Sequence, residues 1–417
     1  MSKIIYDCII LGGGASGLFA ASMLAKLTSG KAKILVVDGN DRCGKKLALT
    51  GSGRCNLSNK NASVDKYHTD DPELLDKCLK AFGSGDAVSF FENDLGIVTV
   101  CDNGLYYPAT YRAQTVIDSF RFYLEDSGVE MKFGSRCTKI SLNNGLYELD
   151  LKDGSTAKSR NLIVAAGGSA YPSTGSDGTV GTLLKGLIDA KDLISFKPAL
   201  TSLTSRMQGI KSLAGIRCRG KVELSDGSKV VDSSDGEIIF SKEGGISGIC
   251  VMDISGIAVS LLDKGVKPVV IVNLIDKSEE EAMEMLKMRR EKFASRPITS
   301  ALSGMMPRVL CEFVCRTAGI DPAKTIGNLS HKEISTFAKS LCEMKIPVDG
   351  FGGNDKAQVS SGGVKLSAMN SDMQYRNMKG LYITGEALNV DGRCGGFNLQ
   401  WAWSSAAAAA KGVAADV

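Results

Sequence analysis

The sequence predicts an α/β protein in which a parallel sheet carries helices and a second region of short strands and helices is inserted. Three observations support this prediction. An apolar run at residues 4–11 is followed by closely spaced glycines and by an alanine- and leucine-rich segment at 18–27. A second apolar run, at 379–384, also leads into glycine but lies near the other end of the chain. Between them, residues 192–274 alternate short β-like runs with glycine, serine and aspartate.

The first apolar run is expected to form a buried strand that turns directly into a helix. The turn, GGGASG at residues 12–17, satisfies the pattern G-x-G-x-x-G. In that pattern Gly12 permits a tight turn, Gly14 lets the backbone approach a pyrophosphate, and Gly17 lets the helix pack on the strand. The unpaired N–H groups at the start of the helix then face the phosphates. The sequence therefore predicts a dinucleotide site at this turn.

The later elements indicate which dinucleotide is bound. Residues 33–38 are expected to form a second strand that ends at Asp38, whose carboxylate accepts hydrogen bonds from a ribose. Residues 379–386 resemble the late strand and Gly-Glu turn by which flavoproteins of the glutathione-reductase type return to their cofactor, and an alanine-rich helix at 399–411 follows. Residues 161–168 give a middle strand ending in two glycines, which in that class lies beside the adenosine half. We therefore expect FAD, bound by a discontinuous Rossmann-type domain of the glutathione-reductase type.

Two stretches far apart in the chain repeat the triplet Gly-Arg-Cys: TGSGRCNLSN at 50–59 and DGRCGGFNLQ at 391–400. Both follow strands whose ends meet at the ligand-binding crevice of an open α/β sheet, so we expect one site built from both. Their glycines would let the backbone approach the flavin ring, where N–H groups stabilise negative charge. Arg54 is expected to pair with pyrophosphate or a substrate carboxylate, or else to form a surface ion pair. Cys55 and Cys394 are interpreted as buried thiols, because disulfide reductases place their two cysteines close in sequence.

The predicted site residues come from these turns and strand ends. Tyr171 is the first candidate for the catalytic proton donor and Tyr107 the second, with Arg54 beside them; Tyr171 has the alternative of packing against the flavin or adenine. No metal ligands are predicted. The predicted FAD-binding residues are Gly12, Gly14, Ala15, Ser16, Gly17, Asp38, Gly39, Lys46, Gly51, Ser52, Gly53, Arg54, Cys55, Asn56, Ala166, Gly167, Gly168, Gly385, Glu386, Gly395, Gly396, Phe397 and Asn398.

Five motifs together resemble the BaiN/YhiN-type flavoproteins: GGGASG, LALTGSGRCNLSN, VAAGGSAYPSTGSDG, GEIIFSKEGGISG and GEALNVDGRCGGFNLQWAWSSA. That group includes aminoacetone oxidase-like proteins and bile-acid or steroid enone reductases. The resemblance spans essentially the whole chain and implies FAD, a two-part flavin domain and an inserted domain on the substrate side. The chain departs from the usual pattern at Asp38, where Glu is commoner, at Cys394, and at Leu105–Pro108.

The inserted region is expected to contain a small antiparallel sheet followed by helices. Short strands are predicted at 222–224, 229–231, 237–240 and 269–272. Helix starts are predicted at Ser278–Glu281 (a capping box), Asp321–Pro322 and Ser330–Glu333. The predicted domains are 1–191 and 346–417 for FAD binding, 192–277 for the β-rich insert, and 278–345 for a helical subdomain.

Three functions are compatible with these motifs and with the family resemblance. The first is reduction of the C=C bond of a bulky, apolar enone such as a 3-oxo steroid or bile acid, with NAD(P)H as a transient reductant, since no second G-x-G-x-x-G unit is found. The alternatives are an aminoketone oxidase that releases hydrogen peroxide and an RNA-modifying flavoprotein; a flavin-binding sensor without catalysis is a further option.

The overall composition bears on partners and location. The net charge is only +4, and no basic-aromatic stretch is found. Both observations argue against a nucleic-acid partner. The sequence has no run of 18 or more apolar residues, so no membrane-spanning helix is predicted. Twelve scattered cysteines favour a reducing cytoplasm over a disulfide scaffold. The oligomeric state is not predicted.

Overall fold

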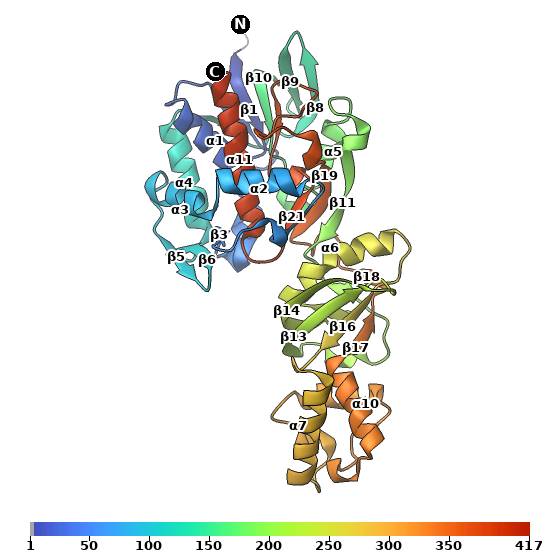
Figure 1. The fold of residues 1–417 in the computed structure, drawn as a ribbon. Coiled ribbons are helices and arrows are strands. Elements are labelled where there is room, and N and C mark those ends of the chain that lie inside the picture. Colours follow the sequence, from blue (N-terminus) through green and yellow to red (C-terminus); the bar gives the residue numbers. More distant parts are fainter. Residues whose placement is uncertain (1–3) are drawn as a thin grey trace. The chain divides into compact units, whose positions relative to one another are not determined.

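The computed structural model describes residues 4–417 and divides into two compact units (Figure 1). Unit 1 comprises Met1–Pro198 and Gln358–Val417, and unit 2 comprises Ala199–Ala357. These boundaries lie later in the chain than the ones expected at 191/192 and 345/346. The first boundary is later because strand β11 (Leu193–Ala199) pairs with β19 (Val359–Val364) and so stays with unit 1. The second is later because β17 (Met344–Pro347) and β18 (Gly350–Phe351) pair within the sheet of unit 2.

Unit 1 is built on a seven-stranded sheet with the order β7-β2-β1-β10-β9-β8, and β20 pairs with β10. The parallel strands are β7 (Glu130–Lys132), β2 (Ile34–Val37), β1 (Ile5–Leu11), β10 (Thr156–Val164) and β20 (Leu381–Ile383). An antiparallel hairpin, β8 (Cys137–Asn143) and β9 (Leu146–Leu151), extends it. Central strands covered on both faces are continuously apolar, as ILVV in β2 is. The predicted parallel sheet is confirmed.

Two helices from opposite ends of the chain, α1 (Ala15–Leu27) and α11 (Phe397–Ala415), pack against each other in unit 1. The alanines of the run 406–410 that face this contact are fully buried, and their small side chains allow the two backbones to come close. The principal neighbour of α11 is α1. Both helices also begin earlier than expected, directly after glycine.

Aromatic side chains pack around Phe19 of α1. Phe19 lies 5.3 Å from Trp403 and 5.4 Å from Phe82, measured between ring centroids. The surrounding helices are α2 (Pro72–Ala81), α3 (Ser84–Asn93) and α4 (Ala113–Asp126). Two small sheets complete this side of unit 1: β3 (Ser58–Asn59), β6 (Leu105–Pro108) and β5 (Thr99–Asp102), and the pair β4 (Tyr67–Thr69) and β21 (Val390–Gly392). A short helix, α5 (Thr179–Leu183), follows the loop after β10.

Unit 2 contains a seven-stranded antiparallel sheet with helices that share one hydrophobic core with it. The strands are β12 (Leu203–Thr204), β13 (Arg217–Ser225), β14 (Val230–Phe240), β15 (Gly245–Ser247), β16 (Val269–Asn273), β17 (Met344–Pro347) and β18 (Gly350–Phe351). The helices are α6 (Ile249–Asp263), α7 (Glu279–Lys292), α8 (Ile298–Ala301), α9 (Arg308–Thr317) and α10 (His331–Cys342). Unit 2 thus contains both the strands and the helices that were predicted for the inserted region, within one compact unit.

Local details of unit 2 differ from the sequence-based expectations in two places. The strands expected at 229–231 and 237–240 are one continuous strand, because the Ser-Ser-Asp-Gly segment between them keeps its pairing with β13. The helix expected at Asp321–Pro322 is wrong: the Asp321 carboxylate accepts a hydrogen bond from Ala323 N at 2.9 Å within a single turn. The capping box at Ser278 is confirmed, and so is the helix start at Ser330, where the structure also has a capping box. Among residues 4–417, no helix combines the length and apolarity needed to cross a membrane.

Candidate functional site

The glycine-rich turn after β1 has no room for a side chain at Gly12 or Gly17, but it has room for one at Gly14. A Cβ atom on Gly12, where φ is +114°, would lie 2.4 Å from Ala165 O, and one on Gly17 would lie 1.8 Å from Gly12 O. A Cβ on Gly14 would meet no described atom within 4 Å. Helix α1 starts at Gly14 without a side-chain cap and without an acid in its first turn. Its N–H groups therefore face open space, which suits an anionic pyrophosphate.

Asp38 lies at the edge of this turn. Its Oδ2 accepts a hydrogen bond from Gly13 N at 2.6 Å, and its Oδ1 accepts from Asn40 N at 2.7 Å and Asn40 Nδ2 at 2.9 Å. The Asn40 amide also donates to Thr174 O at 2.9 Å, so it joins the loop after β2 to the loop after β10. Gly39 packs closely against Arg136 in the same region. A carboxylate oxygen accepts more than one hydrogen bond, so Asp38 can also accept from ribose hydroxyls.

A buried serine in the loop after β10 fits a cofactor at this place. The Ser176 hydroxyl has no hydrogen-bond partner among the described residues, although the residue is only 6% exposed. It lies beside Gly167, where a Cβ would come within 2.9 Å of Ser176 Oγ and φ is +73°. Buried hydroxyls without partners are rare, and a polar ligand atom at this strand end would supply one. Sequence reasoning missed Ser176, although it follows the predicted Gly167–Gly168 pair in the same motif.

The structure brings the two Gly-Arg-Cys stretches together by direct hydrogen bonds. Asn59 Nδ2 donates to Gly395 O at 2.8 Å. With its amide oriented to satisfy both neighbours, Asn56 accepts from Gly396 N at 3.1 Å and donates to Ser58 O at 2.8 Å. Ser58 Oγ donates to Gln400 Oε1 at 2.6 Å. These residues flank the triplets, and they hold the start of α11 against the loop that follows β2.

A second connection runs from Lys46 to the loops after β10 and β20. Lys46 Nζ lies 2.6 Å from Glu386 Oε2, and both side chains are largely buried. Glu386 Oε1 accepts from Ser360 N at 2.8 Å and Ser360 Oγ at 2.9 Å. Ser360 Oγ in turn accepts from Ser169 N at 2.7 Å. A Cβ on Gly168 would lie 2.7 Å from Ser360 Oγ, so glycine is needed where these loops meet.

The turn before α11 is fixed by side chains around it. Asn398 Nδ2 donates to Gly392 O at 2.7 Å, and Asn398 Oδ1 accepts from Gly392 N at 2.8 Å. Tyr67 Oη donates to Phe397 O at 2.9 Å. Gly396, with φ of +87°, precedes the helix, which has no side-chain cap and no acid in its first turn. As in α1, the start of α11 favours negative charge placed near it.

Of the predicted catalytic residues, Arg54 and Tyr107 lie together. The Arg54 guanidinium carbon is 5.5 Å from the centre of the Tyr107 ring, and Arg54 Nε donates to Gly51 O at 3.2 Å. Tyr107 is 6% exposed, and burial raises the pKa of its hydroxyl while the nearby Arg54 charge opposes that rise. Tyr107 is therefore protonated at neutral pH.

Tyr171 occupies a different setting. Its backbone is left-handed, with φ of +56°, and its carbonyl accepts from Thr174 Oγ1 at 2.7 Å. No contact among the described residues joins its ring to Tyr107 or Arg54. The structure therefore separates the first sequence-based candidate from the group formed by the second and Arg54.

The two cysteines of the triplets differ in burial. Cys55 is fully buried, and burial raises the pKa of its thiol to about 12, although a hydrogen bond with Thr50 lowers it. Cys394 is only partly buried, in contrast to the expectation. No disulfide is present among the described cysteines. A buried thiol with a raised pKa is a poor nucleophile, so Cys55 belongs to the packing of the loop.

The chain is similar to proteins of one family along its whole length. The family model described as HI0933-like protein Rossmann domain matches residues 6–412. A 3-dehydro-bile acid delta(4,6)-reductase of Clostridium scindens is 32% identical over 400 residues, which cover 95% of this chain and 96% of that protein. The ribosomal RNA dihydrouridine synthase of Escherichia coli is 25% identical, with 97% of each chain covered, and that of Haemophilus influenzae is 27% identical, with 96% and 97% covered.

A solved structure shows the same fold. The 3-ketosteroid delta1-dehydrogenase of Sterolibacterium denitrificans, in complex with 1,4-androstadiene-3,17-dione, aligns with a TM-score of 0.54 at 11% identity, covering 99% of this chain and 100% of that one. The family match and the 32% identical relative, together with the glycine-rich turn and the returning strand, establish that the chain belongs to the HI0933-like family of Rossmann-domain proteins and is an FAD-dependent oxidoreductase.

Proposed function

We propose that the protein reduces a C=C bond that is conjugated with a carbonyl group. The names of the two kinds of relative support this proposal because they describe one chemistry: a delta(4,6)-reductase of a 3-dehydro-bile acid and a synthase of dihydrouridine both saturate a C=C bond next to a carbonyl system. In such a reduction a hydride adds to the β-carbon and a proton to the α-carbon. When bound, FAD would supply the hydride-transfer chemistry, with a reductant of the NAD(P)H class as the source of the two electrons.

The chain's own residues supply the binding and the proton. The uncapped starts of α1 and α11 and the Asp38 carboxylate would hold the phosphates, the flavin edge and the ribose of FAD. Tyr107 is our proposed proton donor, because its hydroxyl is protonated and the residue is nearly buried. Its ring also lies beside Gly51 and Arg54, which belong to the loop predicted to contact the flavin. The exposed Arg54 would attract an acidic group of the substrate. Tyr171 remains the competing donor.

Two substrate classes fit the proposed chemistry. The first is a 3-oxo steroid or bile acid, supported by the relative with 32% identity over nearly the whole of both chains. The second is a uridine in RNA, supported by two relatives with 25% and 27% identity over equally long alignments. We place the steroid first because of the higher identity. The aminoketone oxidase stays a prediction, and so does a cytoplasmic location.

The experiment that tests the proposal follows the colour of the flavin under anaerobic conditions. The purified protein is bleached with NADH, NADPH or dithionite, and each candidate oxidant is then added. A 3-oxo-Δ4,6 bile acid or a uridine-containing RNA is expected to restore the yellow absorbance and to yield the saturated product by mass spectrometry. If oxygen with aminoacetone is the only combination that turns over, C=C reduction is wrong and the oxidase alternative stands.

Replacing the proposed proton donor is the matching test on the chain. Tyr107→Phe is expected to lower turnover by about 10²–10⁴-fold, the usual contribution of a positioned acid, while bound FAD stays the same. Because the pKa of Tyr107 is raised, wild-type turnover is expected to persist above pH 10, the ordinary tyrosine value, and to fall as pH rises through the raised value. Tyr171→Phe is the competing variant: a loss there, with Tyr107→Phe still active, would transfer the role to Tyr171.

A further inference from the structure

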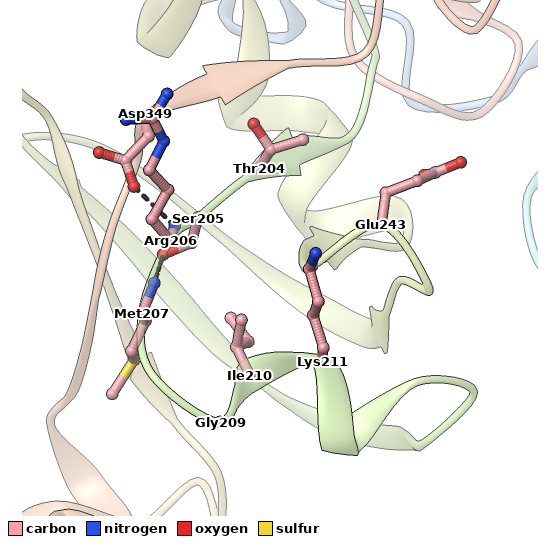
Figure 2. A pocket seen from close by; sticks show the side chains of 10 residues that line it. Thr204, Ser205, Arg206, Met207, Gly209, Ile210, Lys211, Glu243 and Asp349 are labelled. Carbon is pink, nitrogen blue, oxygen red and sulfur yellow. Dashed lines mark hydrogen bonds between the residues drawn. The ribbon is translucent and has the colours of Figure 1, made fainter.

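Unit 2 contains a cleft that the proposed reaction does not account for. Its volume is about 560 Å³, within the range of small-molecule sites. Figure 2 shows Arg206 and Asp349 on one side of the cleft, Lys211 and Glu243 on the other, and Thr204 between them. The residues that line it are Thr204, Ser205, Arg206, Met207, Gly209, Ile210, Lys211, Glu243, Gly244 and Asp349.

The wall of the cleft is shaped by the glycines of the motif GEIIFSKEGGISG. A Cβ on Gly245, where φ is +143°, would lie 2.2 Å from Leu203 O, so only glycine lets this turn approach β12. Gly244 O accepts from Ser205 N at 3.2 Å. A Cβ on Gly244 would come within 3.1 Å of the Lys211 side chain. The turn and the segment 203–206 are thus fixed against each other, with Lys211 extended across Gly244.

The two cationic side chains of the cleft form no ion pair with any described residue, whereas each of its two carboxylates has a hydrogen-bond partner. Glu243 Oε1 lies 2.6 Å from Lys356 Nζ. Asp349 Oδ2 accepts a hydrogen bond from Arg206 N at 2.7 Å. Within the described chain, neither the Arg206 guanidinium nor the Lys211 ammonium forms an ion pair, and both residues are exposed. Two cations without an acidic partner therefore face one cleft, a few residues apart in sequence but on opposite walls (Figure 2).

We infer that this cleft binds a phosphate group of a nucleotide. Donors that approach from opposite walls suit a tetrahedral anion, which accepts hydrogen bonds from several directions, better than a planar carboxylate. Arginine and lysine are the usual phosphate partners, and the Thr204 hydroxyl adds a third donor on the same rim. The inference rests on the proposed function, which supplies two nucleotide ligands: an RNA substrate and the pyridine dinucleotide reductant.

The test compares binding of two probes by the FAD-loaded full-length protein. A short fluorescein-labelled oligouridylate is followed by anisotropy, and NADPH by its own fluorescence, each over a range of salt concentrations. Arg206→Ala/Lys211→Ala is expected to weaken binding of one probe by about tenfold or more. If that probe is the oligonucleotide, the slope of log affinity against log salt should fall by about 1–2. Inorganic phosphate should compete with the probe on the wild type.

Two further variants separate the cleft from general charge. Lys332→Ala removes an exposed lysine of α10 outside the cleft lining and should bind both probes as the wild type does. Arg206→Lys/Lys211→Arg keeps the charges and should restore most of the affinity. Equal binding of both probes by the wild type and the double alanine variant, or no binding of either by the wild type, overturns the inference. Anaerobic flavin reoxidation is measured separately, so a failure of the proposed reaction is distinguished from a failure of the cleft.

Discussion

The two Gly-Arg-Cys stretches have the same three letters but different structures. In the first, Arg54 is exposed and lies over the Tyr107 ring, and Cys55 is fully buried with a left-handed φ of +57°. In the second, Gly392 is the last residue of strand β21, and Arg393 N donates to Lys66 O at 2.9 Å. Cys394 is partly buried. The triplets therefore do not form a symmetric pair.

The contact between the stretches is made by the residues that flank the triplets. Asn56 and Asn59 of the first stretch bond to Gly396 and Gly395 of the second. The Asn56 side chain can reach the opposite backbone because Gly396 leaves room for it, since a Cβ on Gly396 would lie 2.8 Å from the Asn56 amide. The repeated triplet is therefore a poor guide to the site, whereas the Asn and Gly-Gly neighbours determine its geometry. Substitutions at and around this joint are expected to affect both stability and FAD binding.

The largest effect is expected from Gly396→Ala. A Cβ at this position would lie 2.8 Å from the end of the Asn56 amide and 2.8 Å from Ser58 O, on a backbone with φ of +87°. Backbone strain and overlap together are expected to lower the free energy of unfolding by about 3 kcal/mol. Because the same joint precedes α11, bound FAD should be lost as well. Denaturant unfolding and the flavin absorbance of the purified variant measure the two effects.

The control is Gly145→Ala in the turn between β8 and β9. This glycine also has a left-handed φ, +77°, but a Cβ there would meet no described atom within 4 Å. It therefore isolates backbone strain, about 1 kcal/mol, with FAD content unchanged. Similar losses of stability in both variants would show that the joint between the two stretches contributes nothing beyond local strain.

A smaller effect is expected from Lys46→Met, which breaks the other connection between the two ends of the chain. The Lys46–Glu386 pair is mostly buried, with side chains 22% and 18% exposed, and its loss leaves the Glu386 carboxylate with Ser360 alone. A cost of about 1–2 kcal/mol in unfolding free energy is expected. Lys45→Met is the matched control, since its partner Asp41 is 76% exposed, and it should change stability by less than about 0.5 kcal/mol. Equal effects would mean that the Lys46–Glu386 pair stabilises the fold no more than a surface ion pair does.

The elements that sequence reasoning predicted best are those whose evidence is local. The turn at 12–17, the capping box at Ser278 and the helix start at Ser330 depend on spacings of a few residues, and the structure has each of them. The predicted helix at Asp321–Pro322 shows the limit of that approach, because an Asp-Pro pair starts a turn as readily as a helix. Local chemistry alone does not decide whether the chain continues as a helix.

The parts of the site that sequence reasoning missed depend on contacts between distant segments. Nothing in the letters around Lys46 indicates Glu386 as its partner, and nothing around Ser360 indicates Gly168. Likewise, only the fold shows that Arg54 lies over the Tyr107 ring.

The smallest effect is expected at Cys55, where the two triplets differ in chemistry as well as structure. Burial raises the pKa of the Cys55 thiol from 9.0 to about 12, so the folded state keeps the proton that the unfolded state releases. The stabilisation is therefore complete below pH 9 and is lost as pH rises toward 12. Wild-type unfolding free energy should decline more steeply than that of Cys55→Ala across this window, by no more than about 1 kcal/mol near pH 9.5.

Alkylation of the native protein tests the same difference directly. With iodoacetamide at pH 8, the exposed Cys101 should be labelled first and the partly buried Cys394 more slowly, while Cys55 should stay unlabelled until the protein is unfolded. Peptide mapping by mass spectrometry gives the order. Rapid labelling of Cys55 in the folded, FAD-loaded protein would mean that its loop opens, and this thiol could then no longer be assigned to packing alone.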